Sequence, residues 1–161
     1  MLSATASAGY AIARRLGQRV ELIDQMERLL QYLITEIDYG LTPLPQALEH
    51  SSRALGEAMN SFCAFVAREL EKGKSLGEAW EMGTVALLEN TSLRSEDVAP
   101  LLTLAPVLGL SDRPDQLRHL KLAGEHLRAV KRDAELEARK NQTLWRYTGV
   151  LSGLVLVLLL M

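Results

Sequence analysis

Apolar residues recur along most of the chain at spacings of three and four, which place them on one face of a helix, and no stretch alternates as a strand does. The first such pattern is a heptad stripe that predicts one long helix. The stripe consists of Leu16, Val20, Ile23, Leu30, Ile34 and Ile37. It stops at Gly40, and glycine commonly ends a helix because it adopts a left-handed conformation easily.

Prolines and capping residues divide the rest of the chain into five further helices. Ser75 and Glu78 have the spacing of a capping box, and Gly73 just before them is suited to end the preceding helix. Pro100 and Pro106 fall inside the fifth helix and predict a kink or an early end, because proline cannot donate to the helical hydrogen bonds. The expected ranges are 42–53, 55–72, 75–89, 95–109 and 111–143. The sequence therefore predicts an all-α bundle of six helices.

The end of the chain is strongly apolar, since residues 144–161 carry a single charge, on Arg146. As a helix this segment spans about 27 Å, close to the hydrocarbon core of a bilayer at about 30 Å. Trp145 and Tyr147 stand at its start, where aromatic side chains favour the membrane interface. We expect a C-terminal transmembrane helix over 144–161. The alternative is a buried core helix, which a bundle of this size could hardly cover.

The beginning of the chain is uncharged over residues 1–13, which as a helix measure only about 20 Å. We interpret this segment as a partial N-terminal transmembrane segment, with a frayed soluble N-terminus as the alternative. Basic residues stand where both segments meet the rest of the chain: Arg14, Arg15, Arg139 and Lys140. The positive-inside rule then places residues 14–143 in the cytoplasm as one helical domain. Gly149 and Gly153 form a GxxxG spacing that permits membrane helix packing.

This topology makes the first and last cytoplasmic helices antiparallel, because both meet the membrane. We call this pair the stem, and the four helices between them the cap, which we expect at the far end of the stem. Residues 14–19 with 112–146 have a net charge of +6, and residues 21–97 a net charge of −8. The acidic cap is either a solvated surface or a docking surface for a basic partner.

The candidate chemistry is sparse. A Gly-Lys-Ser sequence at 73–75 resembles the end of a phosphate-binding loop, but the glycine that this motif needs five residues earlier is missing. His119 and His126 lie seven residues apart, without the i+4 partner of a helical metal site. Cys63 is the single cysteine and we expect it to be a small buried hydrophobic residue. We expect no catalytic, cofactor-binding or metal-binding residues and, at a net charge of −2, no nucleic-acid partner.

Several motifs from about residue 30 onward resemble the stage III sporulation protein AB family of endospore-forming bacteria. They are Glu36, Tyr39-Gly40-x-Thr42-Pro43-Leu44, Gly73, Ala79-Trp80-Glu81, Leu108-Gly109-x-x-Asp112-x-x-x-Gln116-x-x-His119-x-Lys121-Leu122, Lys140-Asn141, Gly149 and the terminal Leu158-Leu159-Leu160-Met161. The resemblance implies a subunit of a secretion-like channel between mother cell and forespore, in the mother-cell membrane that surrounds the forespore. It also implies a six-helix cytoplasmic domain similar to those of the inner-membrane platform proteins of type II secretion and type IV pilus systems. The implied partners are the secretion-type ATPase and other membrane subunits of the same complex.

We therefore hypothesise a non-enzymatic membrane platform that docks a cytoplasmic ATPase. Tyr39 and Gly40 at the first turn and Asp112 and Gln116 at the last are candidate partner-interface residues, with helix caps and turn contacts as their alternative role. The alternative function is a tail-anchored helical adaptor with one membrane span, unrelated to sporulation. The sequence leaves the oligomeric state open, a homo-oligomer included.

Overall fold

The structure, a computed structural model, describes the backbone of residues 2–39, 44–110 and 112–160 and the side chains of residues 11–39, 45–110, 112–141 and 143. In these ranges the chain forms six helices and no strand. They are α1 (Leu2–Tyr39), α2 (Leu44–Ser52), α3 (Glu57–Glu71), α4 (Leu76–Glu89), α5 (Ser95–Leu102) and α6 (Arg113–Leu160). The prediction of an all-α fold with six helices is confirmed.

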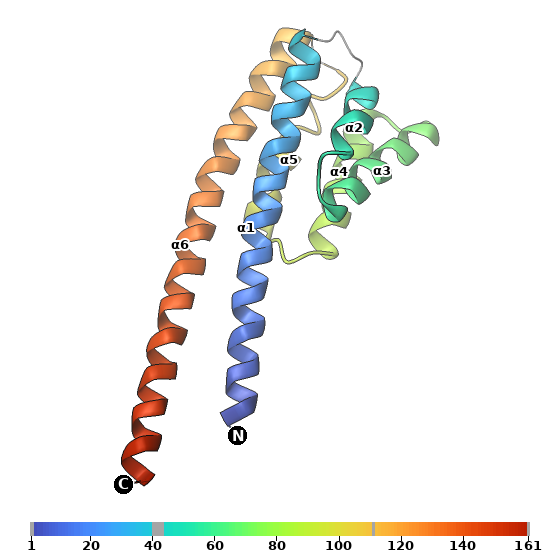
Figure 1. Cartoon of the computed structure of the whole chain (residues 1–161). Helices are drawn as coiled ribbons and strands as arrows, with labels where there is room; N and C mark the ends of the chain where they lie inside the picture. Colours follow the sequence, from blue (N-terminus) through green and yellow to red (C-terminus); the bar gives the residue numbers. More distant parts are fainter. Residues whose placement is uncertain (1, 40–43, 111, 161) are drawn as a thin grey trace.

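The two long helices α1 and α6 lie side by side and antiparallel, so that both chain ends lie at the same end of the molecule (Figure 1). Charged pairs cross the helix interface: Arg128 of α6 donates to Glu27 of α1 at 2.7 Å, and Lys131 donates to Asp24. At the end of the stem opposite the chain termini, Arg113 donates to the backbone carbonyl of Asp38. We keep the name stem for this pair.

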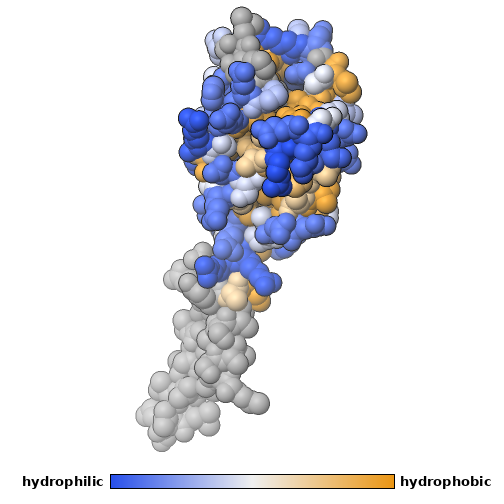
Figure 2. Space-filling view, turned by 90° about the vertical axis from the view of Figure 1, so that its right-hand side faces the viewer, coloured by the Kyte–Doolittle hydropathy of each residue, from blue (hydrophilic) through white to orange (hydrophobic). Residues whose placement is uncertain are grey.

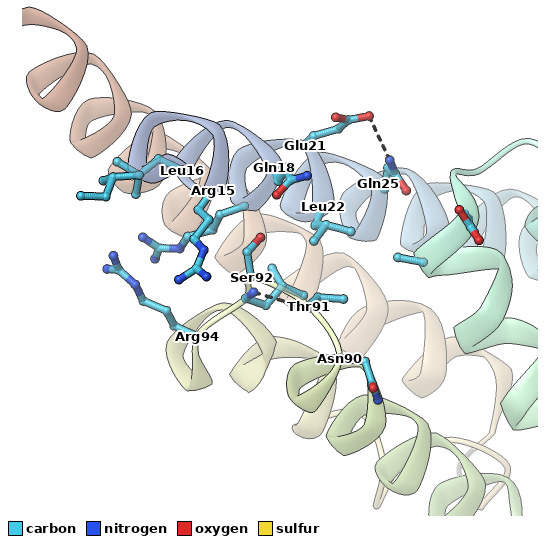
Figure 3. Close-up of a pocket in the computed structure, with 15 residues that line it drawn as sticks. Arg15, Leu16, Gln18, Glu21, Leu22, Gln25, Asn90, Thr91, Ser92 and Arg94 are labelled. Carbon is cyan, nitrogen blue, oxygen red and sulfur yellow. Dashed lines mark hydrogen bonds between the residues drawn. The ribbon is translucent and has the colours of Figure 1, made fainter. Parts of the chain in front are cut away.

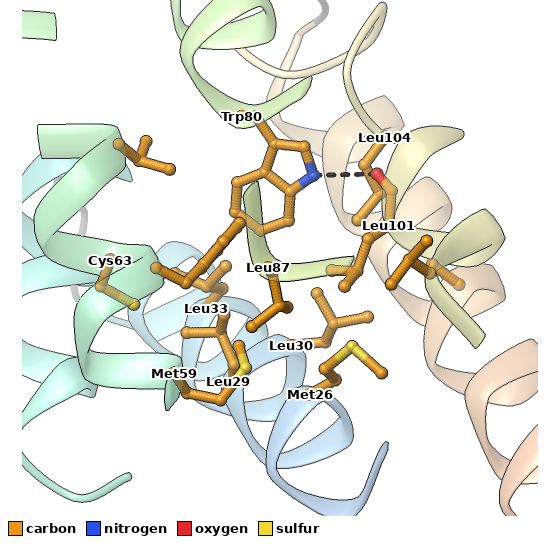
Figure 4. Close-up of a cluster of buried hydrophobic side chains, with 14 of the residues drawn as sticks. Met26, Leu29, Leu30, Leu33, Met59, Cys63, Trp80, Leu87, Leu101 and Leu104 are labelled. Atoms are coloured by element: carbon orange, nitrogen blue, oxygen red, sulfur yellow. Dashed lines mark hydrogen bonds between the residues drawn. The ribbon is translucent and has the colours of Figure 1, made fainter. Parts of the chain in front are cut away.

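The cap, α2–α5, lies beside the stem and packs against the flank of α1 (Figure 1), so the expectation that it sits at the far end is wrong. The reason is that α1 buries a second line of side chains that the heptad stripe does not include. Met26, Leu29 and Leu33 are fully buried, and Figure 4 shows them among side chains of the cap helices. Of the predicted stripe, Ile23, Leu30 and Ile37 are buried, whereas Leu16, Val20 and Ile34 are half-buried.

The core of the cap is organised around Trp80 of α4, which is fully buried. Its indole N–H donates to the carbonyl of Leu101 at 2.8 Å, which ties α4 to α5 (Figure 4). Phe62 of α3 meets the indole edge-on at a centroid distance of 5.1 Å. Cys63 next to it is buried, as expected, and burial raises the pKa of its thiol to about 12.

The local signals in the sequence work as predicted at three helix ends. Ser75 and Glu78 form the capping box of α4. Gly73 follows α3 with φ +86°, and the N–H groups of Gly73 and Lys74 return to the carbonyls of Leu70 and Glu69, as in a Schellman C-cap. Asp112 caps α6 by accepting from the N–H of Asp115 at 3.1 Å.

The fifth helix differs from its expected range of 95–109, because α5 ends at Leu102. Pro106 is four residues further on, and its ring would clash with the Leu102 carbonyl of a continuing helix. Residues 103–110 form successive turns. At its start, the carboxylate of Asp97 provides the cap by accepting from the N–H of Arg94 at 2.7 Å.

Among the described residues, no helix combines the length and the apolarity that crossing a bilayer requires. The segments predicted to meet the membrane, 1–13 and 144–161, fall almost entirely on residues whose side chains the structure does not describe. The two expected spans therefore gain no support from the structure and stay predictions.

Two glycines provide a matched test of the packing between α4 and the turns that follow α5. A Cβ added to Gly77 would overlap the carbonyl oxygen of Ala105, whereas one added to Gly124 of α6 has nothing within 4 Å. We expect Gly77→Ala to lower the free energy of unfolding by about 1–3 kcal/mol through overpacking. Gly124→Ala should raise it by about 0.5–1 kcal/mol, because alanine favours a helix interior. Urea unfolding of the detergent-solubilised full chain, followed by circular dichroism, measures both, and equal effects would contradict the close approach.

Candidate functional site

The most distinctive polar feature is a cluster of charged side chains where α1, α5 and α6 meet, which has a buried ion pair at its centre. We call this cluster the charge joint. It consists of Arg19, Arg94, Glu96, Asp97 and Glu137. The side chain of Arg19 is only 5% exposed and that of Asp97 is 0% exposed. Arg19 donates to both carboxylate oxygens of Asp97 at 2.8 Å, and also to Glu96 at 2.8 Å and Glu137 at 2.7 Å. One guanidinium thus connects three helices.

Two further contacts complete the joint. Arg94 donates to the two carboxylate oxygens of Glu137 at 2.6 and 3.0 Å. Asp97 accepts from Arg19 and from the N–H of Arg94, so the same carboxylate neutralises a buried cation and caps α5. Such charge-assisted, bidentate pairs are the strongest hydrogen bonds a side chain makes.

The pKa values in the joint and along the stem follow from these contacts. The hydrogen bond that Glu137 accepts from Arg94 lowers the pKa of Glu137, and the hydrogen bond that Arg19 donates to Asp97 raises the pKa of Arg19. On the stem, the hydrogen bond from Lys131 lowers the pKa of Asp24 and raises that of Lys131 itself. All these groups are therefore held in their charged forms at neutral pH.

The sequence analysis did not identify the joint, although a signal was present. Arg19 lies seven residues before Met26 and fourteen before Leu33, which are both fully buried. A charged residue on a buried helical line needs a buried partner of opposite charge. Asp97 could not be assigned as that partner, because 78 residues separate it from Arg19.

Beside the joint, a groove of about 1,020 Å³ runs between α1 and the segment that links α4 to α5 (Figure 3). Gln18, Gln25, Thr91 and Ser92 give it a polar lining. Two buried atoms in it, Gln25 Oε1 and Ser92 Oγ, have no hydrogen-bond partner among the described residues. A polar groove of this size with unpaired hydrogen-bonding atoms is suited to water.

Of the predicted partner-interface residues, Tyr39, Asp112 and Gln116 lie at one end of the stem. There Arg113 of α6 donates a hydrogen bond to the end of α1. Tyr39 is 85% exposed there. Asp112 is exposed and caps α6, and the N–H of Gln116 donates to the Asp112 carbonyl at 3.0 Å. Gly40 lies outside the described residues. A partner role for these residues stays a prediction.

Other candidate residues from the sequence are placed as follows. Gly149 and Gly153 lie in the part of α6 whose side chains are not described, so their role in helix packing stays a prediction. His119 lies 3.8 Å from Asp115 on the same helix. In the described part of the chain no group of three or more His, Cys, Asp or Glu side chains is placed to hold a metal ion.

An antiparallel helical hairpin with four helices packed on its flank defines this chain as an all-α, stem-and-cap bundle protein. The family model of stage III sporulation protein AB matches residues 1–161, the whole chain. The chain belongs to the stage III sporulation protein AB family. The member from Bacillus subtilis (strain 168) is 35% identical over 159 residues, which cover 98% of this chain and 93% of that protein. A solved structure of stage III sporulation protein AB matches with a TM-score of 0.70 at 32% identity, covering 76% of this chain and 97% of that one.

The family membership supports a role in sporulation. It confirms the resemblance drawn from the sequence motifs. The single membrane span of the tail-anchored alternative is not tested by this match.

Replacing Arg19 tests the contribution of the joint to stability. We expect Arg19→Met to lower the free energy of unfolding by about 3–5 kcal/mol, because it leaves the carboxylate of Asp97 buried without a counter-charge. Adding Asp97→Asn should recover most of this loss, since no charge is then buried and the amide oxygen can still cap α5. Arg28→Met is the control: Arg28 pairs with Asp24 at the surface, and its loss should change stability by less than about 1 kcal/mol. Urea unfolding at pH 7 measures all three, and an Arg19→Met protein as stable as Arg28→Met would contradict the role of the joint.

The lowered pKa values of Glu137 and Asp24 predict a loss of stability in acid. A carboxylate whose pKa is lower in the folded state stabilises the fold above its unfolded pKa, ordinarily 4.5 for Glu and 3.8 for Asp. This stabilisation is lost as the pH falls through the folded pKa. We expect the melting temperature to be nearly constant from pH 8 to 6 and to fall below about pH 5.

Glu137→Gln should lower the melting temperature at pH 7 and flatten the decline between about pH 5 and 3. Glu71→Gln is the control, because Glu71 is exposed and has no ion pair within the described residues. Calorimetric scans across the pH range would contradict the prediction if both variants had the same profile.

Proposed function

We propose that this chain is a non-enzymatic scaffold subunit of a secretion-like channel between mother cell and forespore. Its terminal segments attach it to the membrane, its stem extends into the cytoplasm, and its cap docks the secretion-type ATPase of the same complex. Membership of the stage III sporulation protein AB family supports a role in sporulation. The observation that carries the docking proposal is the excess of unpaired acidic charge on the cap.

This excess arises because the cap pairs its cations and leaves carboxylates free. Four of its five Lys and Arg residues lie within 4.0 Å of a carboxylate: Arg53, Arg68, Lys72 and Arg94. Four exposed glutamates have no hydrogen bond or ion pair within the described residues: Glu57, Glu71, Glu81 and Glu89. Unpaired surface charge of one sign attracts a partner of opposite charge and speeds its association.

The opposite charge collects at the end of the described stem that adjoins the two apolar terminal segments. Arg14, Arg15, Arg139 and Lys140 are exposed, and none of them has an ion pair among the residues that the structure describes. The antiparallel pairing of Arg19 with Glu137 places these four residues at about the same level of the stem. A basic collar next to two apolar segments is typical of a protein that contacts anionic lipid headgroups. This arrangement supports attachment with the cap directed away from the membrane.

The stem is suited to hold the cap at a fixed distance and orientation. Its two helices share ion pairs along their interface and a row of buried leucines, among them Leu30, Leu120 and Leu127. The charge joint then fixes the cap to both helices at once. A docking event at the cap would therefore act on the whole stem as one rigid element.

Reversing the free carboxylates tests the docking proposal. We expect a variant with Glu57→Lys, Glu71→Lys, Glu81→Lys and Glu89→Lys to bind the purified ATPase at least tenfold more weakly at about 0.15 M ionic strength, and wild-type binding to weaken as salt is raised. The measurement is the dissociation constant, obtained with the full chain in nanodiscs.

The control is a variant with exposed stem carboxylates reversed, Glu125→Lys with Asp133→Lys, which should bind as the wild type does. Circular dichroism must show both variants folded. Equal affinity of the cap variant and the wild type, or the absence of wild-type binding, would refute the proposal.

A further inference from the structure

The outer face of α4 carries acidic and apolar side chains together, and the helix contains no basic residue. The helix carries Glu78, Glu81 and Glu89 and no Lys, Arg or His. Its exposed hydrophobic residues, Met82 and Val85, lie between them. Positions 78, 82, 85 and 89 follow one helical line at spacings of four, three and four. The side of the molecule seen in Figure 2 shows hydrophobic side chains between charged ones on the cap.

Beside this face runs an apolar groove of about 660 Å³, formed by the first turns of α4 and the turns at 102–110. Leu76, Leu102, Pro106 and Leu108 line it, and Glu81 stands among the lining residues. We call it the α4 groove. Its volume is in the range of sites that accept a large side chain or a small ligand.

The backbone around the α4 groove is held by two glycines. Gly77 allows the carbonyl of Ala105 to approach α4 closely, and Gly109 turns the chain with φ +81° beside the side chain of Leu76. The indole N–H of Trp80 also donates to the nearby carbonyl of Leu101. The groove is therefore a preformed feature of the cap, which reduces the ordering that binding requires.

Leu110 adds an exposed apolar side chain to the edge of the groove, with 82% of its surface accessible. Leu102 inside the groove is also exposed in part. An apolar groove with exposed leucines and a glutamate at its margin matches the anatomy of a protein interface, a desolvated centre within a polar rim.

We infer that the α4 groove and the outer face of α4 together bind one segment of a partner protein, in which a large apolar side chain is flanked by Lys or Arg. The apolar side chain enters the groove between Leu76 and Leu102, and the flanking cations pair with Glu81 and Glu89. This inference rests on the proposed function, under which the docked ATPase carries the segment.

The charges of the surface favour this occupant over a second copy of the chain. In a twofold dimer the same surface patch of both subunits meets, which would place Glu81 and Glu89 close to the same carboxylates of the other copy. The polar groove beside the charge joint suits an apolar side chain less, since buried Gln25 Oε1 and Ser92 Oγ line it without partners in the described residues. A basic segment with a large apolar side chain matches both the carboxylates of α4 and the apolar α4 groove.

The test compares charge reversal on α4 with charge reversal on α3, and it also replaces Leu110 at the edge of the α4 groove. With the full chain in nanodiscs and the purified ATPase as probe, we expect Leu110→Ser and the pair Glu81→Lys with Glu89→Lys each to weaken binding at least tenfold. Their matched controls are Leu122→Ser, an exposed leucine of α6, and the α3 pair Glu57→Lys with Glu71→Lys. Both controls should stay within twofold of the wild type. A photo-crosslinking residue at position 110 should capture the ATPase, and one at position 122 should not.

The outcomes separate this inference from the proposed function. If the α3 pair weakens binding and neither Leu110→Ser nor the α4 pair does, the α4 site is refuted while docking through the acidic cap stands. If no cap variant weakens binding, both fail. A crosslink from position 110 to a second copy of this chain would refute the stated occupant. Circular dichroism confirms that each variant is folded, and the exposure of Leu110 and the glutamates makes these changes compatible with folding.

Discussion

The structure depends on one desolvated cation, the guanidinium of Arg19. Without its carboxylates such a group would be far too costly to bury, so α1 can occupy its place only when α5 and α6 supply Asp97 and Glu137. Apolar stripes alone tolerate a shift along the helix, because one leucine can replace another. A bidentate pair at 2.8 Å does not tolerate such a shift. The joint therefore fixes the register of stem and cap, while the surrounding leucines provide most of the hydrophobic stabilisation.

The position of the cap follows from the width of the buried surface on α1. A hairpin of two helices covers only a narrow stripe on each partner. The line of Met26, Leu29 and Leu33 lies beyond that stripe and would face water if the cap sat at the tip of the stem. Packing α2 and α3 on the flank of α1 buries this line together with Met59 and Trp80. The same placement brings α5 close enough for Asp97 to reach Arg19.

Features that depend on a few neighbouring residues could be predicted from the sequence, and features that depend on distant pairs could not. The capping box at Ser75, the C-cap at Gly73 and the proline effect on α5 are local, and each is found close to its expected position. The charge joint and the α4 groove instead arise where distant segments meet. Periodicity identifies which face of a helix is buried but not which element covers it. For this reason Arg19 entered the sequence-based prediction only as part of the basic charge of the stem, without its buried partner.

The pairing of charges determines where unpaired positive and negative charges remain on the molecule. Within the stem interface and the joint, cations and carboxylates neutralise each other, so these charges specify geometry and exert little field outside. The unpaired charges that remain have opposite signs in different places, a basic collar near the apolar segments and free glutamates on the cap. A scaffold needs this division, because the charges that hold it together cannot also be available to partners. The α4 face, where free carboxylates adjoin an apolar groove, is the place where the cap retains both charge and unburied hydrophobic surface for binding.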